Sequence, residues 1–231
     1  MTLWIIFGAF AILSWVVSSR LKSKFEKYSK IPLPYTGAEI AKMMLTQNGV
    51  NNVSIRPVDG TLTDFYNPTD LSVNLSTKVF SERTVAAAAV AAHETGHALQ
   101  HAQGYKAMAL RTALVPLQNL SSRILNIIFI GMFALAFIMP NVLPYTLALQ
   151  IIIACYAVFT LFSFVTLGVE IDASQRAIKW LTDSGVIAYG ETRDGAVDAL
   201  KWAACTYLVA ALSSLATLLY YILQFTQSSR D

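Results

Sequence analysis

The chain has 231 residues, of which 55% are hydrophobic and only 13% are charged. A typical soluble domain carries about 25% charged residues, so this composition excludes an ordinary soluble enzyme and a disordered chain. The net charge of +3 does not indicate a nucleic-acid partner, because the basic residues are concentrated in the segments expected on one side of a membrane. No nucleic-acid binding is expected.

Three long segments contain no Asp, Glu, Lys or Arg: residues 2–19, 124–169 and 202–227. A helix that crosses a bilayer needs roughly 20 mostly apolar residues. The middle segment is therefore long enough for two such helices, divided near Pro140 and Pro144. The first and last segments can each supply one more.

The expected fold class is a mainly α membrane protein with about four transmembrane helices and a small α+β domain at the membrane surface. The transmembrane helices are predicted at residues 1–19, 124–140, 145–169 and 202–225. Residues 20–123 and 170–201 remain as aqueous segments, which together are long enough for one small domain.

The basic residues indicate an orientation in the membrane. Five of them directly follow the first apolar segment. The positive-inside tendency then places residues 20–123 and 170–201 in the cytoplasm, where 16 of the 17 Lys and Arg would lie, with Arg230 as the exception. A cleavable signal peptide is the alternative interpretation of the first segment, but residues 2–4 lack the positive charge that such a peptide carries.

Residues 53–76 alternate between polar and apolar types, with turn signals at Asp59-Gly60 and Asn67-Pro68. This pattern predicts two or three short antiparallel strands, with an irregular loop as the alternative. An alanine-rich helix is predicted next, over residues 84–104. Ser81 or Thr84 can cap its start, and Gly104 can end it.

The predicted helix carries the pattern H-E-x-x-H, formed by His93, Glu94 and His97. Two histidines four positions apart lie on one helix face, so both imidazoles can bind a single Zn²⁺. Glu94 would act as general base on a water that the ion activates. The alternative is a pair of helix-face histidines that bind no metal.

Two residues could provide a third ligand. His101 lies about 12 Å along the helix from His93, too far to share one ion, so we expect it at the surface or in a supporting role. Glu170 directly follows the third predicted span. Because two spans separate it from His97, both face the same side of the membrane. We predict Glu170 as the third ligand, with a solvated carboxylate as the alternative.

The neighbours of Glu170 suggest further roles. Ser174 is one turn beyond it on the same face and could hydrogen-bond a ligand. Asp172 should point about 200° away and pair with Arg176 at the surface. The strand predicted at residues 71–76 could bind substrate as an added strand. Four residues are candidates for stabilising the oxyanion of peptide hydrolysis, and the spacing selects none of them: Tyr66, His101, Tyr105 and Arg176.

The run from His93 to Gln100, together with residues 169–174, resembles the YugP-type bacterial membrane zinc metallopeptidases over nearly the whole chain. The resemblance implies a zinc-dependent neutral peptidase of a bacterial cell membrane, with two metal-binding histidines and a catalytic glutamate at positions 93, 97 and 94. Glu170 matches the downstream glutamate, a ligand by analogy with gluzincin-like proteases. HtpX-like membrane proteases are similar too, but they have Asp at the place of Ser174.

The leading hypothesis is an integral-membrane zinc endopeptidase with its site at the cytoplasmic face. Its expected partners are the lipid bilayer, membrane-associated protein or peptide substrates, and other membrane proteins. The alternative is a non-catalytic membrane scaffold or partner-binding protein that retains a zinc site, although a scaffold has no need of Glu94. Cleavage inside the bilayer would need a ligand within a span, and the predicted spans contain no Asp or Glu.

Overall fold

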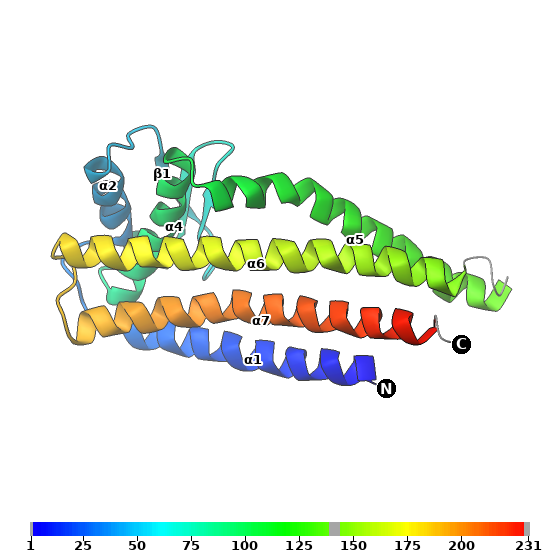
Figure 1. The fold of residues 1–231 in the computed structure, drawn as a ribbon. Coiled ribbons are helices and arrows are strands. Elements are labelled where there is room, and N and C mark those ends of the chain that lie inside the picture. Colours follow the sequence, from blue (N-terminus) through cyan, green and yellow to red (C-terminus); the bar gives the residue numbers. More distant parts are fainter. Residues whose placement is uncertain (1, 139–143, 229–231) are drawn as a thin grey trace. The chain divides into compact units, whose positions relative to one another are not determined.

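A computed structural model describes residues 2–138 and 144–228, with side chains except for residues 132–138. Figure 1 shows the elements in chain order. They are α1 (Thr2–Tyr28), α2 (Gly37–Gln47), β1 (Ser54–Val58), β2 (Phe65–Asn67), β3 (Ser72–Ser76), α3 (Thr77–Ser81), α4 (Val85–Ala102), α5 (Lys106–Ile138), α6 (Tyr145–Asp183) and α7 (Glu191–Ser228). The predicted division at Pro140 lies outside the described residues, and Pro144 directly precedes α6.

Among the described residues, four helices are long and apolar enough to cross a membrane: α1, α5 as far as Gly131, α6 and α7. This finding, with the small sheet, confirms the predicted fold class. The helices are longer than the predicted spans, since α6 continues to Asp183 and α7 begins at Glu191. A charge-free run delimits only the apolar part of a helix, whereas the helix itself continues until a turn interrupts it. Here the turn contains Gly185 and Gly190, both with positive φ.

The chain forms two compact units. The first comprises Met1–Ser14, Leu110–Leu167 and Tyr207–Asp231. It is helical where described and has a small core of its own, formed by Leu125, Ile128, Leu149, Ile152, Cys155 and Tyr221. The second comprises Trp15–Ala109 and Gly168–Thr206, and it holds the sheet, α2 to α4 and the adjoining parts of the long helices. Cys155 and Cys205 are both free.

The sheet has the order β1-β3-β2, with β3 in the centre. β3 pairs antiparallel with β2 and parallel with β1. The strands were predicted correctly in place, but the all-antiparallel arrangement was wrong: polar–apolar alternation identifies strands without setting their order. The proposal that residues 71–76 form an open edge for substrate is also wrong, because β3 has a neighbour on each side and is buried along its length.

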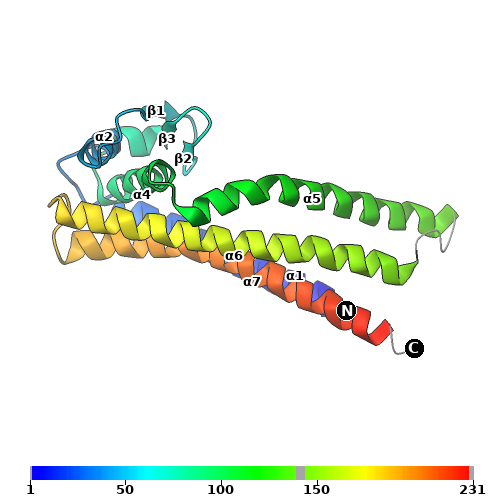
Figure 2. The same ribbon diagram turned by 45° about the horizontal axis from the view of Figure 1, so that its top comes forward.

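Helix α4 is the central element of the second unit. Thr84 caps it, since its Oγ1 accepts a hydrogen bond from the backbone N–H of Ala87 at 3.2 Å. Gly104, with φ +63°, follows its end. The alanines at its start are almost completely buried, and their small side chains let α2, α3 and the sheet pack closely around it. Figure 2 shows α4 between the strands and the adjoining part of α6.

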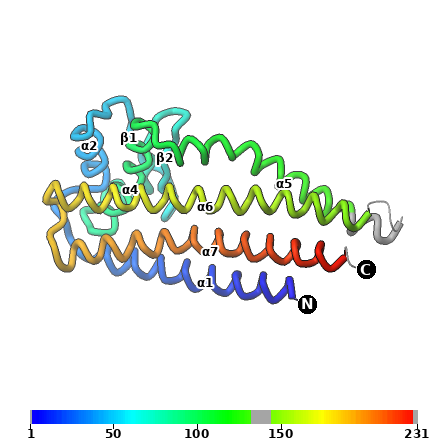
Figure 3. Tube along the Cα trace, viewed as in Figure 1, coloured from blue at the N-terminus to red at the C-terminus, as the bar shows by residue number. Residues whose placement is uncertain are grey.

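A polar cluster joins α1 to α7 within the second unit, where Figure 3 shows the two helices side by side. The carboxylate of Asp198 on α7 accepts a hydrogen bond from Tyr28 Oη at 2.6 Å and lies 2.6 Å from Lys24 Nζ. Burial opposes the charge of Asp198, but Lys24 and Tyr28 outweigh it and lower the pKa of the carboxyl. The same hydrogen bond, with burial, raises the pKa of Tyr28 to about 12.

We expect Asp198→Asn to lower the free energy of unfolding at neutral pH by about 1 kcal/mol, a small value because the pair is partly exposed. The folded pKa of Asp198 is below its ordinary value of 3.8, so the stabilisation is present above about pH 4 and is lost as the pH falls through the folded pKa. Thermal unfolding in detergent between pH 3 and 7 should show the two proteins converging at low pH.

Asp183→Asn is the matched control, because Asp183 pairs with Lys179 at an exposed position of α6. Its effect should be close to zero. An equal difference between wild type and Asp198→Asn at pH 3 and pH 7 would contradict the assigned role of this carboxylate.

Candidate metal centre

Next to the candidate site, helices α4 and α6 pack so closely that their backbones are in contact. A Cβ atom on Gly96 would lie 2.8 Å from the carbonyl oxygen of Ala173 and 3.3 Å from its Cα. Only glycine on α4 and a small residue on α6 permit this approach. The contact brings together His97, which follows Gly96 directly, His93, which lies about one turn before Gly96, and Glu170, which lies about one turn before Ala173.

These three residues form a compact group of donor atoms. Glu170 Oε2 lies 3.1 Å from His93 Nε2 and 3.5 Å from His97 Nε2, and the three ligand atoms all lie within 4.8 Å of one another. Ligand bonds of 2.0–2.2 Å in tetrahedral geometry separate neighbouring ligand atoms by about 3.3 Å. The group therefore fits a zinc ion, and three protein ligands leave a fourth position open, as in catalytic zinc sites.

Both histidines present Nε2 to Glu170, because each Nδ1 has another partner. His93 Nδ1 lies 3.1 Å from Ser174 Oγ, so the structure places Ser174 beside the candidate ligand. His97 Nδ1 lies 3.0 Å from Gln100 Oε1. No role was predicted for Gln100, although its position three residues after His97 on a helix makes the two side chains neighbours.

The three residues are buried, and the carboxylate of Glu170 lies close to both imidazoles. Burial alone would raise the pKa of Glu170, but hydrogen bonds to His93 and His97 lower it well below its usual range. Burial opposes protonation of His97, yet its hydrogen bond to Glu170 and the nearby Glu94 raise the pKa of its imidazole. A carboxylate held ionised next to two imidazoles is a strong donor set for a divalent cation.

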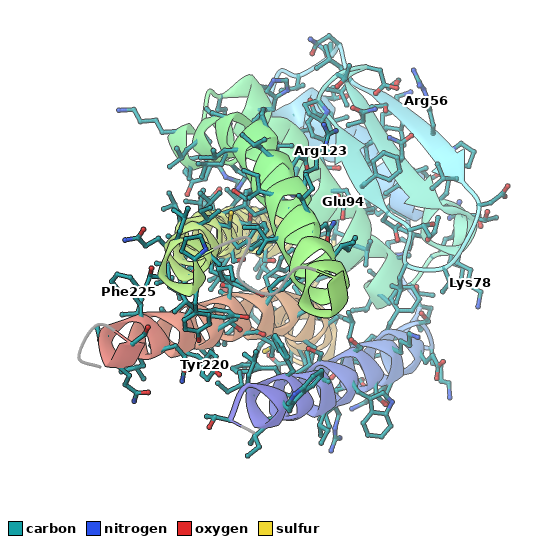
Figure 4. The ribbon with its side chains drawn as sticks, turned by 90° about the vertical axis from the view of Figure 1, so that its right-hand side faces the viewer. Arg56, Lys78, Glu94, Arg123, Tyr220 and Phe225 are labelled. Atoms are coloured by element: carbon teal, nitrogen blue, oxygen red, sulfur yellow. The ribbon has the colours of Figure 1, made fainter. Side chains whose placement is uncertain are left out.

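Glu94 belongs to the same helix but not to the donor group. Figure 4 labels it in the region where α4 and the strands lie. Protein surrounds most of its side chain, although part remains exposed. Burial raises the pKa of Glu94, the histidines oppose this, and the carboxylates of Glu170 and Asp64 add to it. A raised pKa suits a general base that works near neutral pH.

Asp64 acts on the charge of Glu94, although no pattern in the sequence connects the two residues. It lies in the loop before β2, and its carboxylate accepts hydrogen bonds from the backbone N–H of Ser76 at 2.7 Å and from Ser76 Oγ at 3.1 Å. Burial raises the pKa of Asp64, and the bonds to Ser76 work against that rise. A loop carboxylate has no periodic pattern that would connect it to Glu94.

The other candidate residues form pairs outside the donor group. His101 Nδ1 lies 2.7 Å from Tyr66 Oη, on a helix that continues unbroken past His97, and His101 is not part of the group of donor atoms. Arg176 packs over the ring of Tyr105 at 5.6 Å. None of these contacts singles out one of the four as the oxyanion-stabilising group.

The contacts of Asp172 differ in part from those predicted. It pairs with Arg176 Nε at 2.5 Å, as expected, but it also accepts a hydrogen bond from Gln100 Nε2 at 2.7 Å. It is therefore not only a surface partner. The close approach at Gly96 brings α4 near enough for Gln100 to reach Asp172 on α6, which helix periodicity within one segment does not reveal.

Replacing Gly96 with Ala tests the importance of the close approach. We expect zinc affinity to fall roughly tenfold or more and the free energy of unfolding to fall by about 1–3 kcal/mol, because the added methyl overlaps the backbone of Ala173. Zinc competition with a chelating dye and thermal unfolding in detergent measure the two effects. Gly168→Ala is the matched control, since a Cβ there meets nothing within 4 Å. Equal zinc affinity in both variants would contradict this role for Gly96.

Comparisons with known proteins extend over nearly the whole chain. A family model described as "Putative neutral zinc metallopeptidase" matches residues 3–226. A protein of Bacillus subtilis (strain 168) named "Putative membrane protease YugP" is 41% identical over 215 residues, which cover 92% of this chain and 92% of the relative. No solved structure matches. Both matches include the helices that carry the donor group.

Proposed function

Because the chain belongs to this neutral zinc metallopeptidase family, we propose that it is an integral-membrane zinc endopeptidase that hydrolyses peptide bonds of membrane-associated proteins. One observation carries the proposal: α4 and α6 bring His93, His97 and Glu170 within 4.8 Å of one another, with Glu94 at the next position on α4. The candidate metal ligands and the candidate general base therefore lie at the same end of one site.

In this proposal His93, His97 and Glu170 hold the ion. Zinc there would supply a Lewis acid that makes a water acidic enough to attack a peptide carbonyl near neutral pH. Glu94 accepts the proton of that water at its carboxylate and passes it to the amide nitrogen as the C–N bond breaks. Burial raises the pKa of Glu94, and a more basic carboxylate is a better acceptor for the proton of the water.

The proposed location is a bacterial cell membrane, with the site on the cytoplasmic side. The distribution of Lys and Arg along the sequence supports this orientation, and the candidate site lies in the unit that holds residues 20–109 and 170–201. Substrates would then be membrane proteins or their segments next to the membrane.

Cysteine reporters in residues 54–58, introduced after removal of Cys155 and Cys205, should react only with reagents that enter the cell. Labelling from outside would contradict the orientation.

Zinc-dependent proteolysis tests the function itself. The protein purified in detergent should contain about one zinc per chain, cleave unfolded or membrane-protein substrates, lose activity on chelation and regain it when zinc is added back. Zinc binding without any cleavage would favour the non-catalytic scaffold. A protein that binds no zinc would overturn the proposed function.

A further inference from the structure

Gln100 connects the two helices that carry the candidate ligands. Its side chain is completely buried. Its Nε2 donates to the carbonyl oxygen of Val169 at 2.8 Å and to Asp172 Oδ2 at 2.7 Å, and its Oε1 lies 3.0 Å from His97 Nδ1. One side chain on α4 therefore contacts a ligand on its own helix and the residue directly before Glu170 on α6.

The partners of the amide fix its orientation. Both the carbonyl of Val169 and the carboxylate of Asp172 can only accept hydrogen bonds, so the NH₂ group of Gln100 must face them. Its carbonyl oxygen must then face His97 Nδ1. A carbonyl oxygen can only accept, and Nδ1 of His97 must therefore carry the proton.

This arrangement determines which nitrogen of His97 can bind a metal. With the proton on Nδ1, the lone pair of the neutral ring is on Nε2, the atom 3.5 Å from Glu170 Oε2. Ser174 cannot select the tautomer of His93 in the same way, because a hydroxyl can donate or accept. Gln100 thus acts on one histidine specifically.

Helix geometry explains why Gln100 can take this position. Long side chains on a helix lean toward its N-terminus and over the preceding turn, which here contains His97. The close approach of α4 and α6 at Gly96 then brings Val169 and Asp172 within reach of the same amide. Asp172 also accepts a hydrogen bond from Arg176 Nε, so its carboxylate is held from a second side.

We propose that Gln100 is a positioning residue, which holds His97 in the Nδ1-protonated tautomer and so directs its Nε2 to the zinc. The inference rests on the proposed function only in taking zinc as the ion that the group binds. It requires no peptidase measurement, because the tautomer of His97 affects metal binding itself.

Three variants separate the parts of this role. Gln100→Leu removes both the acceptor for His97 and the donors to α6. Gln100→Glu keeps an oxygen that accepts from His97 Nδ1–H, whether the carboxyl is ionised or protonated, but weakens the connection to Val169 and Asp172. Gln103→Leu is the matched control, because Gln103 is exposed near the end of α4 and its side-chain oxygen accepts a hydrogen bond from Arg176, not from His97.

The readouts are zinc affinity by competition with a chelating dye, and the visible spectrum of the Co²⁺-loaded full-length protein in detergent. We expect Gln100→Leu to lose about 10–100-fold in zinc affinity and to change the Co²⁺ spectrum, as is typical when a ligand's supporting partner is removed. Gln100→Glu should recover most of the affinity and the wild-type spectrum, although it should unfold at a lower temperature. Gln103→Leu should match wild type.

Wild-type zinc affinity and an unchanged Co²⁺ spectrum in Gln100→Leu would overturn the inference. An affinity in Gln100→Glu as low as in Gln100→Leu would also overturn it, because Gln100 would then act through its connection between helices and not through His97. Failure of the wild-type protein to bind zinc would instead overturn the proposed function, so the two failures are distinguishable.

Discussion

Replacing Glu94 with Gln is expected to abolish peptide hydrolysis while leaving zinc binding intact. The amide has the size of the carboxyl but cannot accept the proton of the attacking water, and loss of a general base lowers rates by about 10²–10⁴-fold. Glu94 is not one of the three donor residues, so zinc content should stay at the wild-type level. Cleavage rates and metal content of the same purified sample measure both effects.

Glu191→Gln is the matched control for this change, because Glu191 is an exposed glutamate in the first turn of α7. Its hydrolysis rate should equal that of wild type. Retention of full activity by Glu94→Gln would exclude Glu94 as the general base. Loss of zinc together with activity would instead mean that Glu94 contributes to metal binding.

Replacing Glu170 with Ala is expected to reduce zinc affinity by more than about 100-fold. Removal of residues that merely support metal ligands already costs 10–100-fold, and Glu170 would be a ligand itself. The variant also leaves His93 and His97 without the carboxylate that lies between them, so activity should fall with the metal. Chelator competition under identical detergent conditions measures the affinity.

Asp183→Ala is the control on the same helix, because Asp183 is exposed and pairs with Lys179. Its zinc affinity should be that of wild type. If Glu170→Ala bound zinc as tightly as this control, the ion would be held without residue 170, and the three-ligand site would be wrong.

Much of the fold could be predicted from the sequence because membrane spans and amphipathic helices have strong local signals. The charge-free runs gave four spans, and Thr84 and Gly104 marked the ends of α4. The parallel pairing of β1 with β3 could not be predicted, because strand order depends on contacts between segments and not on alternation within one. For the same reason β3 was mistaken for an edge strand.

The same distinction between local patterns and contacts between segments applies to the candidate site. The spacing of His93 and His97 on one helix is a local property, and the two predicted spans between His97 and Glu170 led us to expect both on the same side of the membrane. Gln100 and Asp64 could not be placed in the site, because each contact depends on how a second element packs against α4. The close approach at Gly96 is the feature that would have predicted the contact between Gln100 and Asp172, but a single glycine in a helix does not identify its neighbour.

The density of the zinc-loaded protein, measured by anomalous diffraction at the zinc edge or by electron cryomicroscopy, tests the shared ion most directly. A single zinc peak is expected 2.0–2.2 Å from Nε2 of His93, from Nε2 of His97 and from a carboxylate oxygen of Glu170. A zinc peak bound to other residues, or Glu170 turned away from a zinc held by the two histidines, would contradict the account.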